Sequence, residues 1–161
     1  FVASAAEPSC TETCGPTRAL GVMKPGKLDT EEMEIMKSHT IKGREIIDEI
    51  LVNFGMDGVD YVNILRNIAE FHHESVNGAG YPSGKKGGEI PLEARIVAVA
   101  DIFDALTSQR CYKGAWTNEE AFEALKKLAG EKLDQDCVNA LLENIEEIEN
   151  IQQRFKQDFY G

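Results

Sequence analysis

The chain has 161 residues, a length that fits one domain with its own hydrophobic core. Apolar residues make up 42% of the chain and charged residues 28%, which is typical of a globular protein. The net charge of −11 argues against broad electrostatic binding to DNA or to an anionic membrane. No apolar stretch is long and charge-free enough to span a membrane, and no complete signal peptide is identified, so we expect a cytoplasmic location.

Residues 1–27 carry scattered Pro, Gly, Cys and Thr without a period, and we predict an irregular N-terminal segment there. A helical domain is predicted over residues 28–161. The four cysteines are too few for a disulfide framework. We interpret Cys10 and Cys14 as ordinary thiols, with pairing or metal binding as the alternatives.

The helical pattern begins at Asp29, which can cap a helix together with Glu32 three residues later. Apolar residues then recur at helical spacing, and His39 falls on the same face. Residues 53–58 predict a break, and a second helix is expected over 61–72. Residues 75–90 contain five glycines and one proline, which predicts a long loop of the kind that often carries function.

Three further helices are expected after this loop. Pro91 can start a helix that is apolar nearly all round, which predicts a central, buried position. Thr117 and Glu120 form a capping box for the next helix, and Asp134 can cap a last one that continues past Phe155. No alternating strand pattern appears, so the expected fold is an all-α bundle of about five or more helices.

Three histidines and one aspartate form the candidate site of this bundle. His39, His72 and His73 lie at or near predicted apolar helix faces, where a single histidine is more often an ordinary core residue. Asp101 interrupts an apolar helix, and a buried carboxylate without a partner is very unfavourable. A metal ion is a natural partner for this carboxylate, with neutral imidazoles as further ligands.

The adjacency of His72 and His73 bears on how many metal ions the site holds. Neighbouring side chains on a regular helix point about 100° apart, so one ion is hard for both to reach. The spacing therefore favours more than one metal, an arrangement that supports phosphoester hydrolysis. Mixed nitrogen and oxygen ligands suit several divalent ions, and we expect iron or manganese, with zinc or nickel as alternatives.

Three segments together resemble the HD-GYP family of metal-dependent phosphohydrolases. They are HHESVNGAGYPSG (72–84), IPLEARIVAVADIFDALTSQRCYK (90–113) and KPGKLDTEEMEIMKSH (24–39), within a match over roughly residues 22–142. The resemblance implies an HD-type helical bundle that hydrolyses cyclic di-GMP at a site of two or three metals. It implies metal ligation by four residues: His39, His72, His73 and Asp101.

The same resemblance assigns two further groups of residues. Arg110 and Lys113 match positions that hold the phosphates of the ligand, and an acidic protein needs such local positive charge for a dianionic dinucleotide. Gly80, Tyr81 and Pro82 match the signature loop, which shapes the site or docks partner domains.

The chain departs from the family pattern at the pair that gives the family its name. Cys10-Thr11 stands where a His-Asp pair is expected, so the sequence is identified as an N-terminally truncated or a degenerate member. The hypotheses are a cyclic di-GMP phosphodiesterase, and an inactive signalling module that binds a nucleotide or a partner such as a receiver or diguanylate cyclase domain. The third hypothesis is a purely structural helical bundle with a vestigial site.

Overall fold

The computed structural model describes residues 29–55, 61–108 and 114–160. Within these ranges the chain forms six α-helices and a short 3-10 helix, and no named strand. The predicted all-α class is therefore confirmed. The segment 1–27, with Cys10 and Cys14, lies outside the described residues, as do Arg110 and Lys113.

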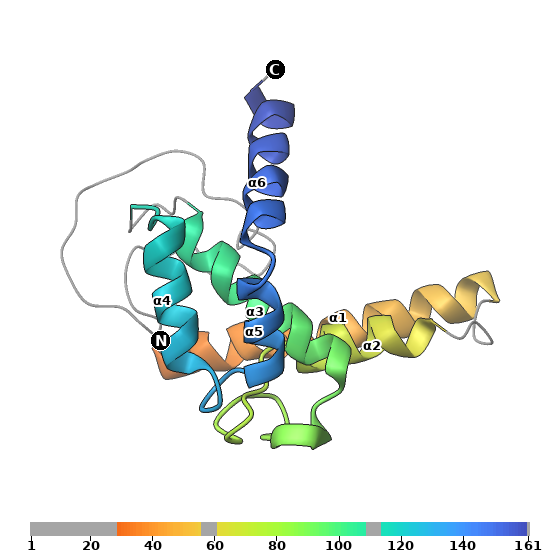
Figure 1. Ribbon diagram of the computed structural model, residues 1–161. Helices are drawn as coiled ribbons and strands as arrows, with labels where there is room; N and C mark the ends of the chain where they lie inside the picture. Colours follow the sequence, from red (N-terminus) through yellow and green to blue (C-terminus); the bar gives the residue numbers. More distant parts are fainter. Residues whose placement is uncertain (1–28, 56–60, 109–113, 161) are drawn as a thin grey trace.

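Helices α1 (Thr30–Phe54) and α2 (Val62–Phe71) lie side by side at one end of the molecule (Figure 1). The predicted capping box at the start of α1 is present, because Asp29 accepts from the Glu32 N–H and the Glu32 side chain accepts from the Asp29 N–H. Gly55 ends α1 in the left-handed conformation, with φ of 65°, which glycine adopts without strain. These caps fix the ends of the helix that carries His39.

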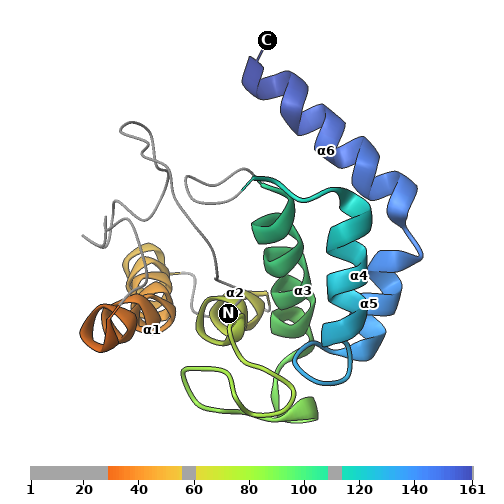
Figure 2. The same ribbon diagram turned by 90° about the vertical axis from the view of Figure 1, so that its left-hand side faces the viewer.

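The core lies between α3 (Leu92–Thr107), α4 (Asn118–Leu128) and α5 (Gln135–Leu142). The rings of Phe103 and Phe122 stack with centroids 5.4 Å apart, and Leu125 and Val138 are fully buried. Helix α3 also contacts α2, so it stands between the α1–α2 pair and the α4–α5 pair (Figure 2). This layering places the end of α2 beside the loop that leads into α3.

Helix α3 is less buried than its sequence predicts. Ala94, Ala98 and Val99 are buried, but Ile96 is 52% exposed and Ala100 is exposed as well. The prediction of a helix buried all round is therefore wrong. Its buried face packs against α2, α4 and α5, and no other described helix covers the opposite side.

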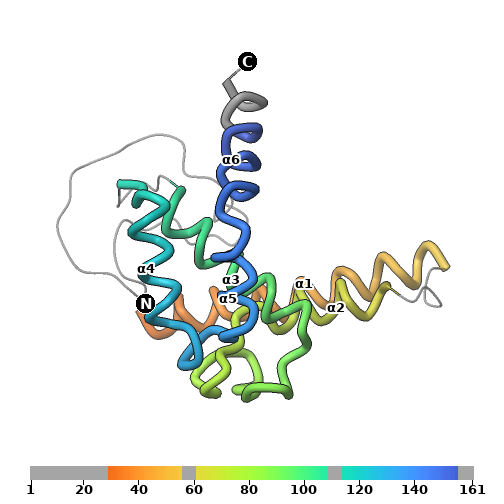
Figure 3. Tube along the Cα trace, viewed as in Figure 1, coloured from red at the N-terminus to blue at the C-terminus, as the bar shows by residue number. Residues whose placement is uncertain are grey.

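The prediction of a single last helix after Asp134 is also wrong, because the chain turns at Glu143 and Asn144. The Asn144 side chain donates to the Ala140 carbonyl and its N–H donates to the Leu141 carbonyl. Asparagine side chains compete in this way for backbone hydrogen bonds and favour helix ends. Helix α6 (Ile145–Tyr160) then projects away from the body of the fold (Figures 1 and 3).

The predicted long loop is confirmed between α2 and α3, where it contains the 3-10 helix η2 (Gly87–Glu89). Pro91 caps the start of α3 and Thr117 with Glu120 caps α4, both as expected. Among the described residues, no helix has the length and apolar character needed to cross a membrane.

Candidate metal centre

The three histidines of the chain meet at one point of the fold. His39 comes from the middle of α1, and His72 and His73 stand where α2 ends. One potential ligand atom of each lies within 4.8 Å of the others, and all three residues are partly buried. The ring centroid of His39 lies 5.4 Å from that of His72 and 5.0 Å from that of His73. Two helices packed side by side therefore assemble the cluster.

Backbone carbonyls orient two of these rings. The Nδ1 atom of His39 lies 2.6 Å from the Met36 carbonyl oxygen, and that of His72 lies 2.8 Å from the Ile68 carbonyl oxygen. Because a carbonyl only accepts, each Nδ1 must carry the proton and donate it. The Nε2 atoms of the two rings then face each other at 3.4 Å. Two ring nitrogens this close are stabilised by a proton that they share or by a metal ion that both bind.

A metal ion fits this arrangement. Two nitrogens bound at about 2.1 Å to one tetrahedral ion lie about 3.4 Å from each other. Histidine ligands also donate their second ring N–H to a carbonyl or carboxylate, which fixes the tautomer, as Met36 and Ile68 do for His39 and His72. The donor set of three imidazoles therefore suits a divalent transition metal.

His73 is held in the neutral form that metal binding needs. Burial, and then unfavourable electrostatic interaction with His72 and His39, lower the pKa of His73 from 6.5 to about 4. The ring is therefore uncharged at neutral pH, and its nitrogen lone pair is free to bind a cation.

The expected divergence of His72 and His73 is wrong. Helix α2 ends at Phe71, His72 is its C-cap and His73 lies in the turn that follows, so the two residues are not on a regular helix. Their ring centroids are only 4.1 Å apart. All three histidines can thus approach one ion, and the spacing of the pair no longer favours several metals.

Asp101 differs from its prediction in burial. It lies on an exposed side of α3, so the argument from a buried, unpaired carboxylate is wrong. It also lies outside the group of three histidines. Its charge still acts on the site, because burial and then the Asp101 carboxylate raise the pKa of Tyr81 from 10.0 to about 12. Asp101 is therefore close enough to Tyr81 for its charge to act there, and its role as a ligand stays a prediction.

The signature loop folds against the histidines. The Tyr81 ring lies 4.9 Å from that of His73 and 6.4 Å from that of His39, centroid to centroid. The Tyr81 N–H donates to the His73 carbonyl, and the Tyr81-Pro82 peptide bond is cis. Gly80 passes so close to the backbone of Glu74 that a Cβ atom there would come within 2.5 Å of the Glu74 Cα. The loop is thus one wall of the candidate centre.

The sequence interpretation missed two residues beside the cluster. Glu74 is 5% exposed and its carboxylate accepts from the Ser83 and Lys85 N–H groups. The Lys37 ammonium lies at the rim, 6.0 Å from the centroid of the Tyr81 ring, and forms an ion pair with Glu34 at 2.8 Å. The signal for Glu74 was its place directly after two histidines and before a glycine-rich turn. Lys37 carries no such signal, because a lysine two residues before a histidine is ordinary on a solvated helix.

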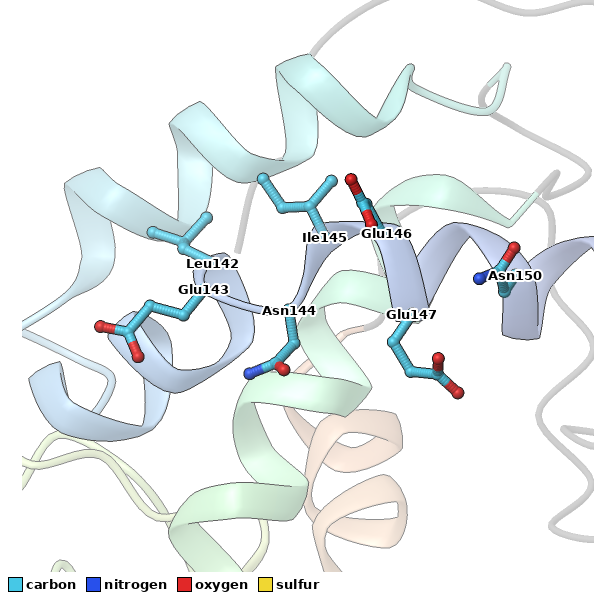
Figure 4. Close-up of a pocket in the computed structure, with 7 residues that line it drawn as sticks. All are labelled: Leu142, Glu143, Asn144, Ile145, Glu146, Glu147 and Asn150. Atoms are coloured by element: carbon cyan, nitrogen blue, oxygen red, sulfur yellow. The ribbon is translucent and has the colours of Figure 1, made fainter.

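Two surface hollows lie elsewhere. One, on α1, is lined by Asp48, Glu49, Val52 and Asn53. The other lies at the α5–α6 junction, where the acidic side chains Glu143 and Glu147 stand apart from each other (Figure 4). Neither contains a histidine, so the histidine cluster remains the candidate site.

Comparisons with known proteins agree with this geometry. A family model described as HD domain matches residues 8–137. The chain is 45% identical over 130 residues to the cyclic di-GMP phosphodiesterase response regulator RpfG of Xanthomonas campestris pv. campestris, covering 81% of this chain and 32% of that protein. It is 40% identical over 143 residues to a cyclic di-GMP phosphodiesterase of Thermotoga maritima, covering 89% of this chain and 36% of that protein.

A third relative is named for another cyclic dinucleotide. The chain is 39% identical over 124 residues to the 3'3'-cGAMP-specific phosphodiesterase 2 of Vibrio cholerae, covering 77% of this chain and 22% of that protein. The chain thus spans about a third or less of the length of these three relatives. Together with the family match over most of its length, the motifs and the histidine cluster establish that the chain belongs to the HD domain family of phosphohydrolases, as its HD-GYP resemblance predicts.

Proposed function

We propose that the chain is the metal-binding portion of a phosphodiesterase that acts on a cyclic dinucleotide, cyclic di-GMP in the first instance. The observation that carries the proposal is the approach of two ring nitrogens, the Nε2 atoms of His39 and His72, to 3.4 Å. The names of the relatives support the substrate class, since they are phosphodiesterases of cyclic di-GMP or 3'3'-cGAMP.

His39, His72 and His73 hold the metal in this proposal, and Asp101 completes the ligand set from α3. We propose iron or manganese, with zinc or nickel as alternatives, because nitrogen and oxygen ligands together suit these ions. Bound divalent ions supply Lewis acidity toward the phosphoryl group and an activated water. The protein fixes the ligand positions through the Met36 and Ile68 carbonyls.

Donor groups near the cluster support an anionic ligand. The Lys37 ammonium lies over the Tyr81 ring, and Tyr81 stays protonated at neutral pH because its pKa is about 12. Tyr81 can therefore donate a hydrogen bond to a phosphate oxygen. Arg110 and Lys113 are proposed to bind the phosphates as well, on the strength of the family resemblance. On a chain with net charge −11, such local cations favour binding of a dinucleotide.

A second function is favoured by the make-up of the cluster. Its three members are histidines, and no carboxylate belongs to the group within the described part of the chain. Cys10-Thr11 stands at the expected His-Asp position. A site without a bridging carboxylate supports a binding module, which would act in the cytoplasm on a receiver or diguanylate cyclase domain.

Hydrolysis of cyclic di-GMP by the purified chain, loaded anaerobically with manganese or iron, tests the proposal. Chromatography of the products should show linear and then mononucleotide forms, and His72→Ala should abolish turnover. Glu89→Gln is the matched control, because Glu89 lies in the same loop region but accepts only the Lys86 N–H. Nucleotide binding without turnover under either metal would establish the binding module instead.

A further inference from the structure

Among the residues that the structure describes, Glu74 is the one acidic residue that is buried. Its side chain is 5% exposed, and both carboxylate oxygens are used: Oε1 accepts from the Ser83 N–H at 2.7 Å and Oε2 from the Lys85 N–H at 3.0 Å. A buried carboxylate is tolerated where such hydrogen bonds replace water. The two donors lie on the far arm of the loop, nine and eleven residues after Glu74.

These bonds close the loop onto the histidines. Between Glu74 and Ser83 the chain passes through Gly80, which lies against the Glu74 backbone, and Tyr81, whose N–H donates to the His73 carbonyl. The Tyr81 ring then rests 4.9 Å from the His73 ring. The Glu74 carboxylate therefore holds the two ends of the segment 74–85 together, and Tyr81 within this segment contacts His73.

We propose that Glu74 is a positioning residue of the metal centre, which holds His73 in its binding orientation by fastening the loop through the Ser83 and Lys85 N–H groups. This inference rests on the proposed function in one respect, namely that the histidines bind a metal. His39 and His72 each have a carbonyl that orients the ring, whereas the His73 ring packs against the His72 ring at 4.1 Å and the Tyr81 ring at 4.9 Å, centroid to centroid. Glu74 acts on His73 through Tyr81.

The chemistry requires a carboxylate of this length. Glutamine has the same shape, but its amide nitrogen would face one backbone donor, so only one of the two bonds could form. Aspartate keeps the charge and both acceptors, but its side chain is one methylene shorter and cannot reach as far. Residues that orient a metal ligand without binding the metal themselves typically raise the metal affinity about 10-fold to 100-fold.

Cobalt binding by Glu74→Gln, followed by visible absorption, tests the inference with a readout other than activity. We expect Co²⁺ affinity to fall about 10-fold, with a changed absorption spectrum because the geometry around the ion changes. Hydrogen exchange should become faster at the Ser83 and Lys85 amides. Glu89→Gln, which removes one charge in the neighbouring turn but leaves an oxygen to accept the Lys86 N–H, should leave the cobalt affinity and spectrum unchanged.

Glu74→Asp keeps the inference testable if the glutamine variant does not fold, as judged by circular dichroism. It should bind Co²⁺ less tightly than the unsubstituted chain. Faster loop exchange with an unchanged cobalt affinity and spectrum would overturn the inference and leave the proposed function intact. Failure of the unsubstituted chain to bind Co²⁺ would overturn both together.

Discussion

The Nε2 atoms of His39 and His72 lie 3.4 Å apart, although the two residues are 33 positions apart in the sequence. The packing of α1 against α2 brings them together, and the carbonyls of Met36 and Ile68 turn their lone pairs toward the same point. Each helix therefore supplies both a candidate ligand and the group that orients it. Any change that alters the packing of these helices should act on the site as well.

The first prediction concerns the close approach of Gly80 to Glu74. In Gly80→Ala, the new methyl carbon would come within 2.5 Å of the Glu74 Cα, which the backbone cannot accommodate without moving. We expect a loss of about 2 kcal/mol in the free energy of unfolding, together with weaker metal binding. Urea denaturation measures the first and Co²⁺ titration the second.

Gly88→Ala is the control for that substitution. A Cβ atom at Gly88 meets nothing within 4 Å, and Gly88 is not among the glycines with positive φ. The variant should therefore unfold like the unsubstituted chain. Equal stability of the Gly80 and Gly88 variants would show that the tight approach of the loop is not maintained in solution.

A second prediction concerns the ion pairs between α1 and α2. Arg44 donates to Glu70 at 2.6 Å, and both side chains are partly exposed, at 34% and 24%. A double-mutant cycle of Arg44→Ala and Glu70→Ala should give a coupling energy of about 0.5 to 1 kcal/mol. The coupling should shrink in 1 M NaCl, because salt screens exposed charges. The exposed pair Lys126–Glu123 should give a smaller value, and an Arg44–Glu70 coupling no larger than this would contradict the structure.

A third prediction concerns the pH dependence that Asp134 contributes. Asp134 caps α5 and pairs with Arg95 of α3 at 2.6 Å. Burial raises its pKa, but the hydrogen bonds from Arg95 and from the Cys137 N–H outweigh burial, so the pKa lies below its ordinary value of 3.8. A carboxyl group whose pKa is lowered in the folded state stabilises the fold at pH values above 3.8. This contribution is lost as the pH falls through the lowered pKa.

Asp134→Asn isolates that contribution, because asparagine can still cap the helix but cannot pair with Arg95. At pH 7 we expect this variant to be less stable by about 1 kcal/mol. The difference should narrow as the pH falls below 3.8, when measured by urea denaturation of both proteins at each pH. Asp136→Asn, an exposed position in the first turn of α5, serves as the control. A difference that does not change with pH would mean that the charge of Asp134 is not the cause.

The helices were predictable from the sequence because their signals are local. Asp29 with Glu32 and Thr117 with Glu120 form the expected capping boxes, since each pair needs only its own helix turn. The break at Asn144 was missed, because an asparagine within an apolar period is equally consistent with a continuous helix. Tertiary packing decides whether the helix breaks at Asn144 or continues.

The geometry of the site depended on contacts that the sequence does not encode locally. The three histidines were identified, but their convergence required the end of α2 at Phe71. The exposure of Asp101 and Ile96 was missed, because an apolar pattern does not show which side of a helix has a neighbour. Glu74 was missed because its partners, the Ser83 and Lys85 N–H groups, are backbone groups that every residue offers.

Metal content after equilibrium dialysis against manganese or zinc, measured by elemental analysis, tests the central claim most directly. The unsubstituted chain should retain at least about one ion per molecule, and His39→Ala and His72→Ala should each lose most of it while keeping their helical circular dichroism. Equal metal content in the unsubstituted chain and in both variants would contradict the assignment of His39, His72 and His73 as the metal centre.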